Sequence, residues 1–586
     1  MKILGFIGRS DIPLAHDGSA SLIVDHKIKF ALEQERLTRK RYAEGQGCFD
    51  ATKVCLDSAG LHLSDLDCIA YGWLEDLKSG SQVSDYVVSS NELTPILLPP
   101  EQFGYTEPPN IHFVKHHYAH AAVTFFTSGF DSAAVLVMDG QGEGVSVSLF
   151  HAKGNTIDLI ETYPVDTSLG MFYGAAGARS GLGWHSGPGK LMGLAPFGQV
   201  RESIDFHFDP DTGRFTLPAL LQKAIDDSPT PPTASDIGML WLNYFEDYHY
   251  PYRQTWKSGW ESVKAYHVAH YADFAASAQH TLETIGHNLV KRLKKLTGEK
   301  NLVLSGGCAL NCTMNEALSR QKIFDNIYIF PAANDAGCSI GAALALSHLL
   351  DPLDPPTAPL ERLPSPAFGS TYTSDAIIAA IKDYGFIPEK LSSEELIERV
   401  SEDLAADKIV AWFRGQDEFG PRALGRRSFL ANPSHRETLG RLNHIKGRET
   451  WRPLAPSVLC EKAKIVLEGP LDPGLHRYML GTATIRPEWR TKIPAVVHVD
   501  FTTRSHLVEK DQDGIYWSLI DRFYQKTGIP LVCNTSLNVA GQPLVHKPEE
   551  VLDIFSTQED VQTLVIEDFY LTKSETIGTE IVDRTH

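Results

Sequence analysis

The sequence predicts an α/β protein of more than one domain. Short apolar runs of strand length alternate with longer amphipathic stretches, which is the pattern of sheets flanked by helices. Several of these runs lead directly into glycine-rich turns, and α/β sheets bind ligands at such strand ends. A chain of 586 residues is also too long for one hydrophobic core, so two or three domains are expected.

The N-terminal part contains most of the expected strands. The runs KILGFIG, SASLIVD, KIKFALE and DCIAYGW have the length of strands, and SAAVLVMDG and KNLVLSGG are strands that end in glycine turns. The stretch YADFAASAQHTLETIGHNLVKRLKKLTG predicts a long helix that ends at Gly298. Residues 228–233, which are rich in proline, are expected to form a surface loop.

A second proline-rich segment divides the chain. Residues 351–366, DPLDPPTAPLERLPSP, contain six prolines and no hydrophobic period, which predicts a semi-rigid linker. We therefore expect an N-terminal domain over residues 1–350 and a C-terminal domain over residues 367–586. The second domain should open with a helix capped by Ser392 and Glu395, followed by a strand, KIVAWF, and a basic loop.

The composition indicates a soluble cytoplasmic protein without a membrane or nucleic-acid partner. No apolar run approaches the ~20 residues that span a bilayer, and the N-terminus predicts a first strand rather than a signal peptide. The eight cysteines include no C-x-x-C pair and are expected to be buried free thiols of a reducing compartment. The net charge of −19 opposes binding to tRNA or DNA.

Two histidines and two aspartates stand where metal ligands are common. His116 and His120 in KHHYAHA are four residues apart, so a helix would place both on one face, although incidental histidines on a packed helix have the same spacing. Asp139 ends a strand before glycines, where a carboxylate can hold a metal or simply begin a turn. Asp335 precedes a helix of small residues, where it would also serve as an N-cap.

Glycine-rich segments near these positions are candidate nucleotide contacts. DGQGEG would let phosphates approach the backbone, although Asp-Gly is also a strong turn signal. LSGGCALN places backbone amides at a helix start, where they would bind a nucleotide or only make a tight connection. HSGPGKLMGLAPFG predicts a glycine-rich loop with a phosphate-binding or merely solvated lysine. The candidates are Gly140, Gly142, Gly306, Gly307, Asn311, Lys190 and Gly193.

The second part of the chain carries a basic cluster. Residues 408–452 contain ten lysines and arginines and four aspartates and glutamates, a local charge of +6 in a chain of −19. These basic residues alternate with glycine, proline and aromatic residues, which favours a folded anion pocket over a solvated face. The later segments DFTTRSH and CNTSLN would add an arginine and small polar groups. The candidates are Arg422, Lys446, Arg452, Arg504, Asn534 and Ser536.

The order of these motifs resembles known families. A strand pair around His16, then H-x-x-x-H, D-G-x-G, S-G-G-x-x-x-N and N-D-x-G, is similar to the actin-like ATPase superfamily and its tRNA threonylcarbamoyl-transferase (TsaD-like) branch. The strings HHYAHA, DGQGE, PGKLMGLA, GPRALGRRS, WRPLAPS and CNTSLN resemble the O-carbamoyltransferases of the tobramycin and nodulation-factor (NodU/CmcH) type. The resemblance implies a duplicated, actin-like α/β domain followed by a YrdC-like α/β domain.

The resemblance also implies a two-step carbamoyl transfer. Carbamoyl phosphate and ATP, with Mg(II), would give carbamoyladenylate in the YrdC-like domain, where Arg422, Lys446 and Ser536 would be catalytic. The two histidines and two aspartates would hold a divalent metal beside the nucleotide phosphates. Two imidazoles and two carboxylates without a thiolate suit Fe(II), Zn(II) or Mn(II), and the branch favours iron. His16 would be the base for a small-molecule hydroxyl, because an imidazole with a near-neutral pKa suits that role.

Three other functions share part of this pattern. A fused tRNA threonylcarbamoyl enzyme would need a basic surface, which this acidic chain opposes. A non-enzymatic, actin-like nucleotide-binding module would not need a second, arginine-rich pocket. A carbamoyltransferase of hydrogenase maturation would carry Cys-rich zinc fingers, and the sequence has none. The identity of the acceptor, which would be a sugar, a polyketide or an alkaloid, and the oligomeric state stay open.

Overall fold

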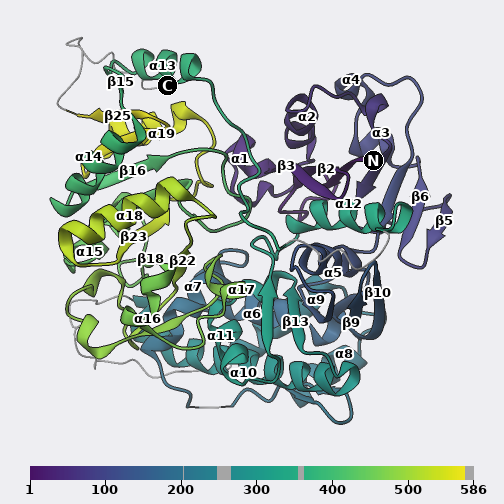
Figure 1. Ribbon diagram of the computed structural model, residues 1–586. Coiled ribbons are helices and arrows are strands. Elements are labelled where there is room, and N and C mark those ends of the chain that lie inside the picture. Colours follow the sequence, from purple (N-terminus) through teal and green to yellow (C-terminus); the bar gives the residue numbers. More distant parts are fainter. Residues whose placement is uncertain (202, 247–265, 354–361, 574–586) are drawn as a thin grey trace.

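The computed structural model describes residues 1–201, 203–246, 266–353 and 362–573, and Figure 1 shows their arrangement. The purple N-terminal strands lie on the right of this view, and the green to yellow C-terminal part lies on the left. Half of the expected linker, residues 354–361, lies outside the described residues, so the division at 351–366 stays a prediction. No helix among the described residues is long and apolar enough to cross a membrane.

The N-terminal part contains two sheets with the same core topology. In each, three neighbouring strands pair antiparallel to one another, and two further strands extend the sheet beside the first of these three in the chain and run parallel to it. This repeat confirms the duplicated α/β architecture that the sequence predicts. The first sheet has the order β3 (Lys27–Glu33), β2 (Ser19–Val24), β1 (Lys2–Ile7), β4 (Cys68–Tyr71), β7 (Ile111–Val114), β6 (Val87–Ser90) and β5 (Ser81–Ser84). The second has the order β10 (Thr156–Pro164), β9 (Val145–Lys153), β8 (Ser132–Met138), β13 (Asn301–Ser305) and β14 (Asn326–Ile329).

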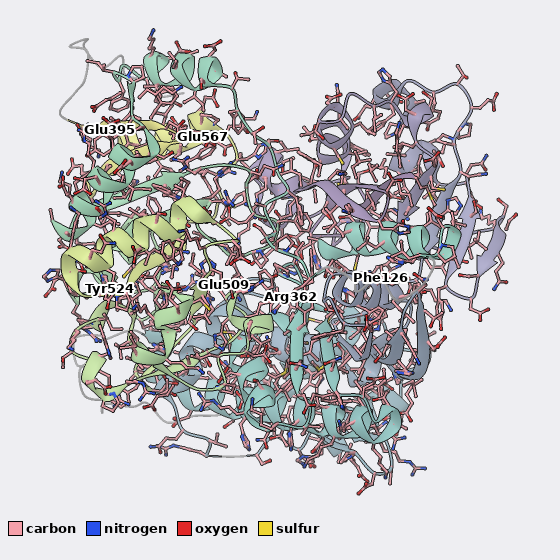
Figure 2. The ribbon with its side chains drawn as sticks, in the orientation of Figure 1. Phe126, Arg362, Glu395, Glu509, Tyr524 and Glu567 are labelled. Carbon is pink, nitrogen blue, oxygen red and sulfur yellow. The ribbon has the colours of Figure 1, made fainter. Side chains whose placement is uncertain are left out.

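Two helices, α5 (His116–Phe126) and α12 (Gly337–Leu350), pack together in the N-terminal part. Helix α5 packs on β8 and β13 of the second sheet, whereas α12 packs on β1, β2 and β4 of the first. The two helix backbones approach closely at Gly341, which has no side chain. An added Cβ atom there would lie only 2.0 Å from the Ala119 carbonyl oxygen. At the far end Phe126, labelled in Figure 2, stacks on His348 with ring centroids 3.8 Å apart. The first turns of both helices therefore meet between the sheets.

Two further helices of the N-terminal part are α10 (Tyr266–Thr297), which the sequence predicts as a helix, and α7 (Gly187–Leu194), which it predicts as a loop. The expected long helix is α10, and Gly298 ends it with φ of +67°. The predicted glycine-rich loop around Lys190 is wrong, because this segment forms helix α7. A proline in its first turn suits a helix start, and a Cβ atom on Gly187 would lie 2.9 Å from Gly177. The glycine thus serves close helix packing.

The C-terminal part is built on one mixed sheet. Its strand order is β15 (Glu389–Lys390), β25 (Phe569–Thr572), β24 (Val561–Ile566), β16 (Ile409–Phe413), β17 (Arg427–Ala431), β23 (Leu531–Ser536), β18 (Ala455–Leu459) and β22 (His506–Val508). Helices α14 (Ser393–Ala405) and α18 (Gly514–Thr527) pack together beside it, and α19 (Pro548–Thr557) packs on β16 and β24. The predicted capping box is present, because Ser392 accepts from the Glu395 amide and the Glu395 carboxylate accepts from the Ser392 amide. The expectation that this helix opens the second part is wrong, because α13 (Ser374–Asp383) precedes it.

The two parts contact each other through buried polar groups. Arg36, which is fully buried, donates to the Gly420 carbonyl at 2.7 Å, and the Gly420 amide donates to Glu33 at 3.0 Å. In helix α11 (Cys312–Arg320), the side-chain amide of Asn315 donates to the Leu480 carbonyl at 2.9 Å. Buried polar groups are costly unless they are hydrogen-bonded. These bonds therefore hold the two parts in a defined relative position.

Candidate functional site

Four side chains from three segments converge at the first turns of α5 and α12. The Nε2 atoms of His116 and His120 lie 3.2 Å apart. Asp139 Oδ2, at the end of β8, lies 3.4 and 3.7 Å from these two nitrogens, and Asp335 Oδ1 lies 3.5 and 3.7 Å from them. The structure therefore brings together all four ligands that the sequence predicts.

Neighbouring groups orient both imidazoles toward this point. His116 Nδ1 donates to the Gly72 carbonyl at 2.9 Å, which leaves the Nε2 lone pair free for a metal. His120 Nδ1 lies 3.1 Å from the Ser305 hydroxyl. The Glu143 carboxylate accepts from the His116 backbone amide at 2.9 Å and so fixes the start of α5. Each of the two histidines is thus supported by a second group.

The donor set fits one divalent ion. Ligand bonds of ~2.1 Å around a tetrahedral or octahedral ion place the donor atoms ~3.0–3.4 Å apart. The nitrogen–nitrogen and nitrogen–oxygen separations of 3.2–3.7 Å are close to these values. Burial would raise the pKa of the Asp139 and Asp335 carboxyls, but the two histidines hold both pKa values below the usual range. Both carboxylates are therefore ionised, as metal ligands must be.

A fifth donor lies beside the histidines and is missing from the sequence prediction. Cys338 Sγ, in the first turn of α12, His116 and His120 offer donor atoms within 4.8 Å of one another. Cys338 is fully buried, and all eight cysteines are free. The predicted set of two imidazoles and two carboxylates is therefore one of two possible groups of metal ligands, and the prediction did not include Cys338 of the other group. A lone cysteine in an apolar helix gives no metal signal in a sequence, so only the packing of α12 on α5 reveals it.

A cavity of about 770 Å³ adjoins this cluster, and residues of both parts of the chain line it. Five of the predicted nucleotide contacts are among the lining residues, namely Gly140, Lys190, Gly193, Gly307 and Asn311. Gly142 and Gly306 are not among them. A Cβ atom on Gly142 would lie 2.8 Å from the His117 ring, and one on Gly306 would lie 2.2 Å from the Met138 carbonyl oxygen. These two glycines allow close packing behind the cavity.

Two of the lining residues have defined partners. Asn311 caps helix α11 by accepting from the Met314 amide, and it exchanges two hydrogen bonds with the Gln279 amide at 2.9 and 3.0 Å. Lys190 forms an ion pair with Glu449 of the C-terminal part at 3.2 Å. Lys190 therefore lies at the junction of the two parts rather than on a free loop.

The opposite wall of the cavity is basic. Arg422, Arg448, Arg452 and Arg504 line it together with Asn534 and Ser536. Burial and the nearby Arg504 lower the pKa of Arg422 to about 9. Such crowding of buried positive charge is costly unless an anion occupies the pocket. Arg448 was part of the basic run in the sequence, but its place in the cavity required the structure.

Lys446 has a different position from the one expected. Its Nζ atom donates to the Ser536 carbonyl at 2.5 Å, the Ser536 hydroxyl at 2.9 Å and the Asn538 carbonyl at 3.1 Å. Lys446 is not among the residues that line the cavity. Its ammonium group therefore holds the loop after β23, which presents Ser536 and Asn538 to the cavity.

His16 lies on the cavity wall in the N-terminal part. His16 Nδ1 is 3.1 Å from Asp17 Oδ2, and its ring centroid is 4.8 Å from that of His185. Burial would lower the pKa of His16, but Asp17, with Asp335 and Asp139 further away, raises it to about 9. The expected near-neutral pKa is therefore wrong for this arrangement, because the sequence pattern does not reveal the effect of the adjacent carboxylate.

Aromatic side chains that the sequence analysis did not single out complete the wall. Trp73 packs on His116 with ring centroids 4.4 Å apart, and Trp451, which is fully buried, lies against the Gly193 end of α7. Tyr42 adopts φ of +65°, and its amide donates to Glu35 at 2.6 Å. Isolated aromatic residues carry no positional signal in one sequence, so these contacts could not have been predicted.

Comparison with known proteins identifies the family. A model described as Carbamoyltransferase N-terminus matches residues 101–344, and one described as Carbamoyltransferase C-terminus matches residues 401–573. Full-length HypF, in its phosphate- and nucleotide-bound form, is a structural neighbour with 13% identity and a TM-score of 0.36, covering 60% of this chain and 56% of that chain.

Curated relatives are similar over nearly the whole chain. Nodulation protein NolNO of Sinorhizobium fredii is 33% identical, over 97% of this chain and 81% of that protein. The protein sll1178 of Synechocystis is 31% identical, over 95% of both chains. Nodulation protein U of Rhizobium tropici is 29% identical, over 91% of both. The chain therefore belongs to the carbamoyltransferase family, and it is an enzyme whose two family regions meet at one cavity.

Proposed function

We propose that the protein is an ATP-dependent O-carbamoyltransferase whose acceptor is a hydroxyl of a small molecule. The observation that carries this proposal is the shared cavity of about 770 Å³. One wall presents an arginine cluster suited to phosphates, and the other presents His16 and the carboxylates of the histidine–aspartate cluster. We assign the first wall to residues 367–586 and the second to residues 1–350, as the expected domain division implies.

The first step takes place at the arginine cluster. Water converts carbamoyl phosphate to carbamate and phosphate, and a carbamate oxygen then attacks the α-phosphorus of ATP. Carbamoyladenylate forms as pyrophosphate leaves. Arg422, Arg452 and Arg504 neutralise phosphate charge and align the weak nucleophile. Ser536 and Asn534 provide further polar contacts, and Lys446 acts through the loop that carries Ser536.

The second step takes place at the opposite wall. The acceptor oxygen attacks the carbamoyl carbon, AMP leaves, and the hydroxyl proton passes to His16. A divalent ion held by His116, His120, Asp139 and Asp335 would supply positive charge for the adenylate phosphate. Because the pKa of His16 is raised to about 9, the neutral imidazole that accepts this proton is the minor form at neutral pH.

The cavity connects the two steps. Carbamate and its adenylate hydrolyse readily in water, so a path inside the protein protects the intermediate. Arg422 donates to the Leu310 carbonyl at 3.1 Å, beside the predicted nucleotide contact Asn311. The basic wall and the nucleotide wall therefore meet at this edge of the cavity, which supports transfer without release into solution.

Pyrophosphate release tests the first step. The protein should release pyrophosphate from ATP only when carbamoyl phosphate is present, and Arg452→Ala should slow this release by tens- to hundreds-fold. Arg441→Ala is a matched control, because Arg441 pairs with Asp407 at 3.1 Å and is not among the cavity residues. Release that does not depend on carbamoyl phosphate would exclude the proposed reaction.

A second variant tests the order of the steps. His16→Asn should still form carbamoyladenylate, detected by mass spectrometry of the quenched mixture, but should transfer no carbamoyl group to aminoglycoside or oligosaccharide alcohols that accept it from the unsubstituted protein. His207→Asn, at an exposed histidine outside the cavity, is the control. Full transfer by His16→Asn would exclude His16 as the base, and loss of adenylate formation would exclude separate sites.

A further inference from the structure

The imidazoles of His116 and His120 belong to two possible sets of metal ligands. With the carboxylates of Asp139 and Asp335 they form one possible set of ligands, and with Cys338 they form another. The donor atoms of each set lie within 4.8 Å of one another. Helix packing fixes the second set, because Gly341 allows α12 to approach the backbone of α5 closely and Cys338 lies one turn before it.

We propose that His116, His120 and Cys338 form a second metal site that overlaps the first and selects thiophilic cations. A thiolate is a soft ligand that prefers Zn(II), Cu(I) and similar ions, whereas carboxylates favour harder ions. Binding would release the Cys338 proton to solvent, because the thiolate is the form that binds metals. The two sites share both imidazoles, so one ion at a time would bind.

The second site would hold an ion in an inactive position. Asp139 and Asp335 line the cavity, whereas His116, His120 and Cys338 are not among the lining residues. An ion drawn toward the thiolate would therefore lie farther from a nucleotide in the cavity. Thiophilic cations should inhibit carbamoyl transfer by this displacement. An ion held by the carboxylates would support transfer, and an ion held by the Cys338 thiolate would not.

Cadmium binding tests this site without an activity assay. The full-length protein, stripped of metal with a chelator, is titrated with Cd(II) while the ultraviolet sulfur-to-cadmium charge-transfer band is recorded. The unsubstituted protein should develop one such band that Cys338→Ser lacks. Loss of groups that merely support a ligand weakens metal binding ~10–100-fold, so loss of the thiolate should weaken Cd(II) binding at least that much.

Two further variants separate the site from general effects. Asp335→Asn should keep the band, because this carboxylate belongs only to the other set. Cys55→Ser, at a fully buried cysteine in the core of the first sheet, should also keep it and controls for the loss of a buried thiol. A band of equal size in Cys338→Ser, or its loss in Cys55→Ser, would overturn the proposal.

The inhibition has its own test. Cd(II) should inhibit carbamoyl transfer by the unsubstituted protein at concentrations at least ~10-fold lower than in Cys338→Ser. This part rests on the proposed function, whereas the absorption band does not. A band without any carbamoyl transfer would leave the thiolate site standing and reject the proposed reaction. Equal inhibition of both proteins would reject the displacement.

Discussion

Replacement of Asp17 by asparagine tests how the protein controls the proposed base. The Asp17 carboxylate lies 3.1 Å from His16 Nδ1 and is the strongest of the influences that raise the pKa of His16. Asparagine has nearly the same shape, but it removes the negative charge. A cation held by Asp139 and Asp335 would offset their smaller influence, so the substitution addresses the main cause of the raised pKa.

The expected shift is large enough to measure. With a pKa of about 9, only ~3% of His16 is neutral at pH 7.5. Loss of an opposite charge at this distance lowers a histidine pKa by ~1–2 units, which would make ~25–75% of His16 neutral at the same pH. The pH at which the transfer step reaches half of its maximal rate should therefore fall by ~1–2 units in Asp17→Asn.

Two measurements check this result. Carbon-13 resonances of the labelled His16 ring give its pKa directly and need no acceptor, and single-turnover transfer from preformed carbamoyladenylate gives the pH dependence of the step. Asp11→Asn is the control, because Asp11 pairs with Arg9 on the same loop. A His16 pKa near 6.5 in the unsubstituted protein, or the same pKa in Asp17→Asn, would refute the reasoning.

Three other predictions follow from the site and its packing. Asp335→Asn should lower bound iron or manganese, measured by mass spectrometry of the metal content, while carbamoyl-phosphate-dependent pyrophosphate release continues; unchanged metal content would contradict the ligand assignment. Arg452→Ala should slow carbamoyladenylate formation by tens- to hundreds-fold, about 2–4 kcal/mol of transition-state stabilisation, as measured by pyrophosphate release. Gly306→Ala should lower the free energy of unfolding by at least ~2 kcal/mol in a urea titration, because Gly306 has φ of +86° and an added Cβ would lie 2.2 Å from the Met138 carbonyl oxygen; an unchanged midpoint would contradict this.

Local patterns in the sequence account for much of the fold. The strands and the long helix were predictable because apolar periodicity and turn residues act over a few positions, as at Gly298 and in the Ser392–Glu395 capping box. The helical spacing of His116 and His120 also predicted their common face. The order of the motifs along the chain and their resemblance to carbamoyltransferases predicted the family. The match of both chain regions to the carbamoyltransferase models confirms it.

The helix at Lys190 and the bonds of Lys446 show where local patterns fail. Glycines suggested a loop over α7, but Gly187 packs against Gly177 and the helix forms because tertiary contact outweighs the low helix propensity of glycine. Lys446 was grouped with the arginines by charge, although its ammonium group binds the loop at Ser536. Neither position could be predicted, because each depends on a partner distant in the chain.

The sequence alone specified the residue types and their places on strands and helices, because those depend on neighbours within a few turns. The shared cavity and the closeness of Cys338 to His116 depend on tertiary structure. Each arises where helices and loops from separate regions pack together. Burial and charge at such contacts are set by distances in space, and one sequence carries no direct record of these distances.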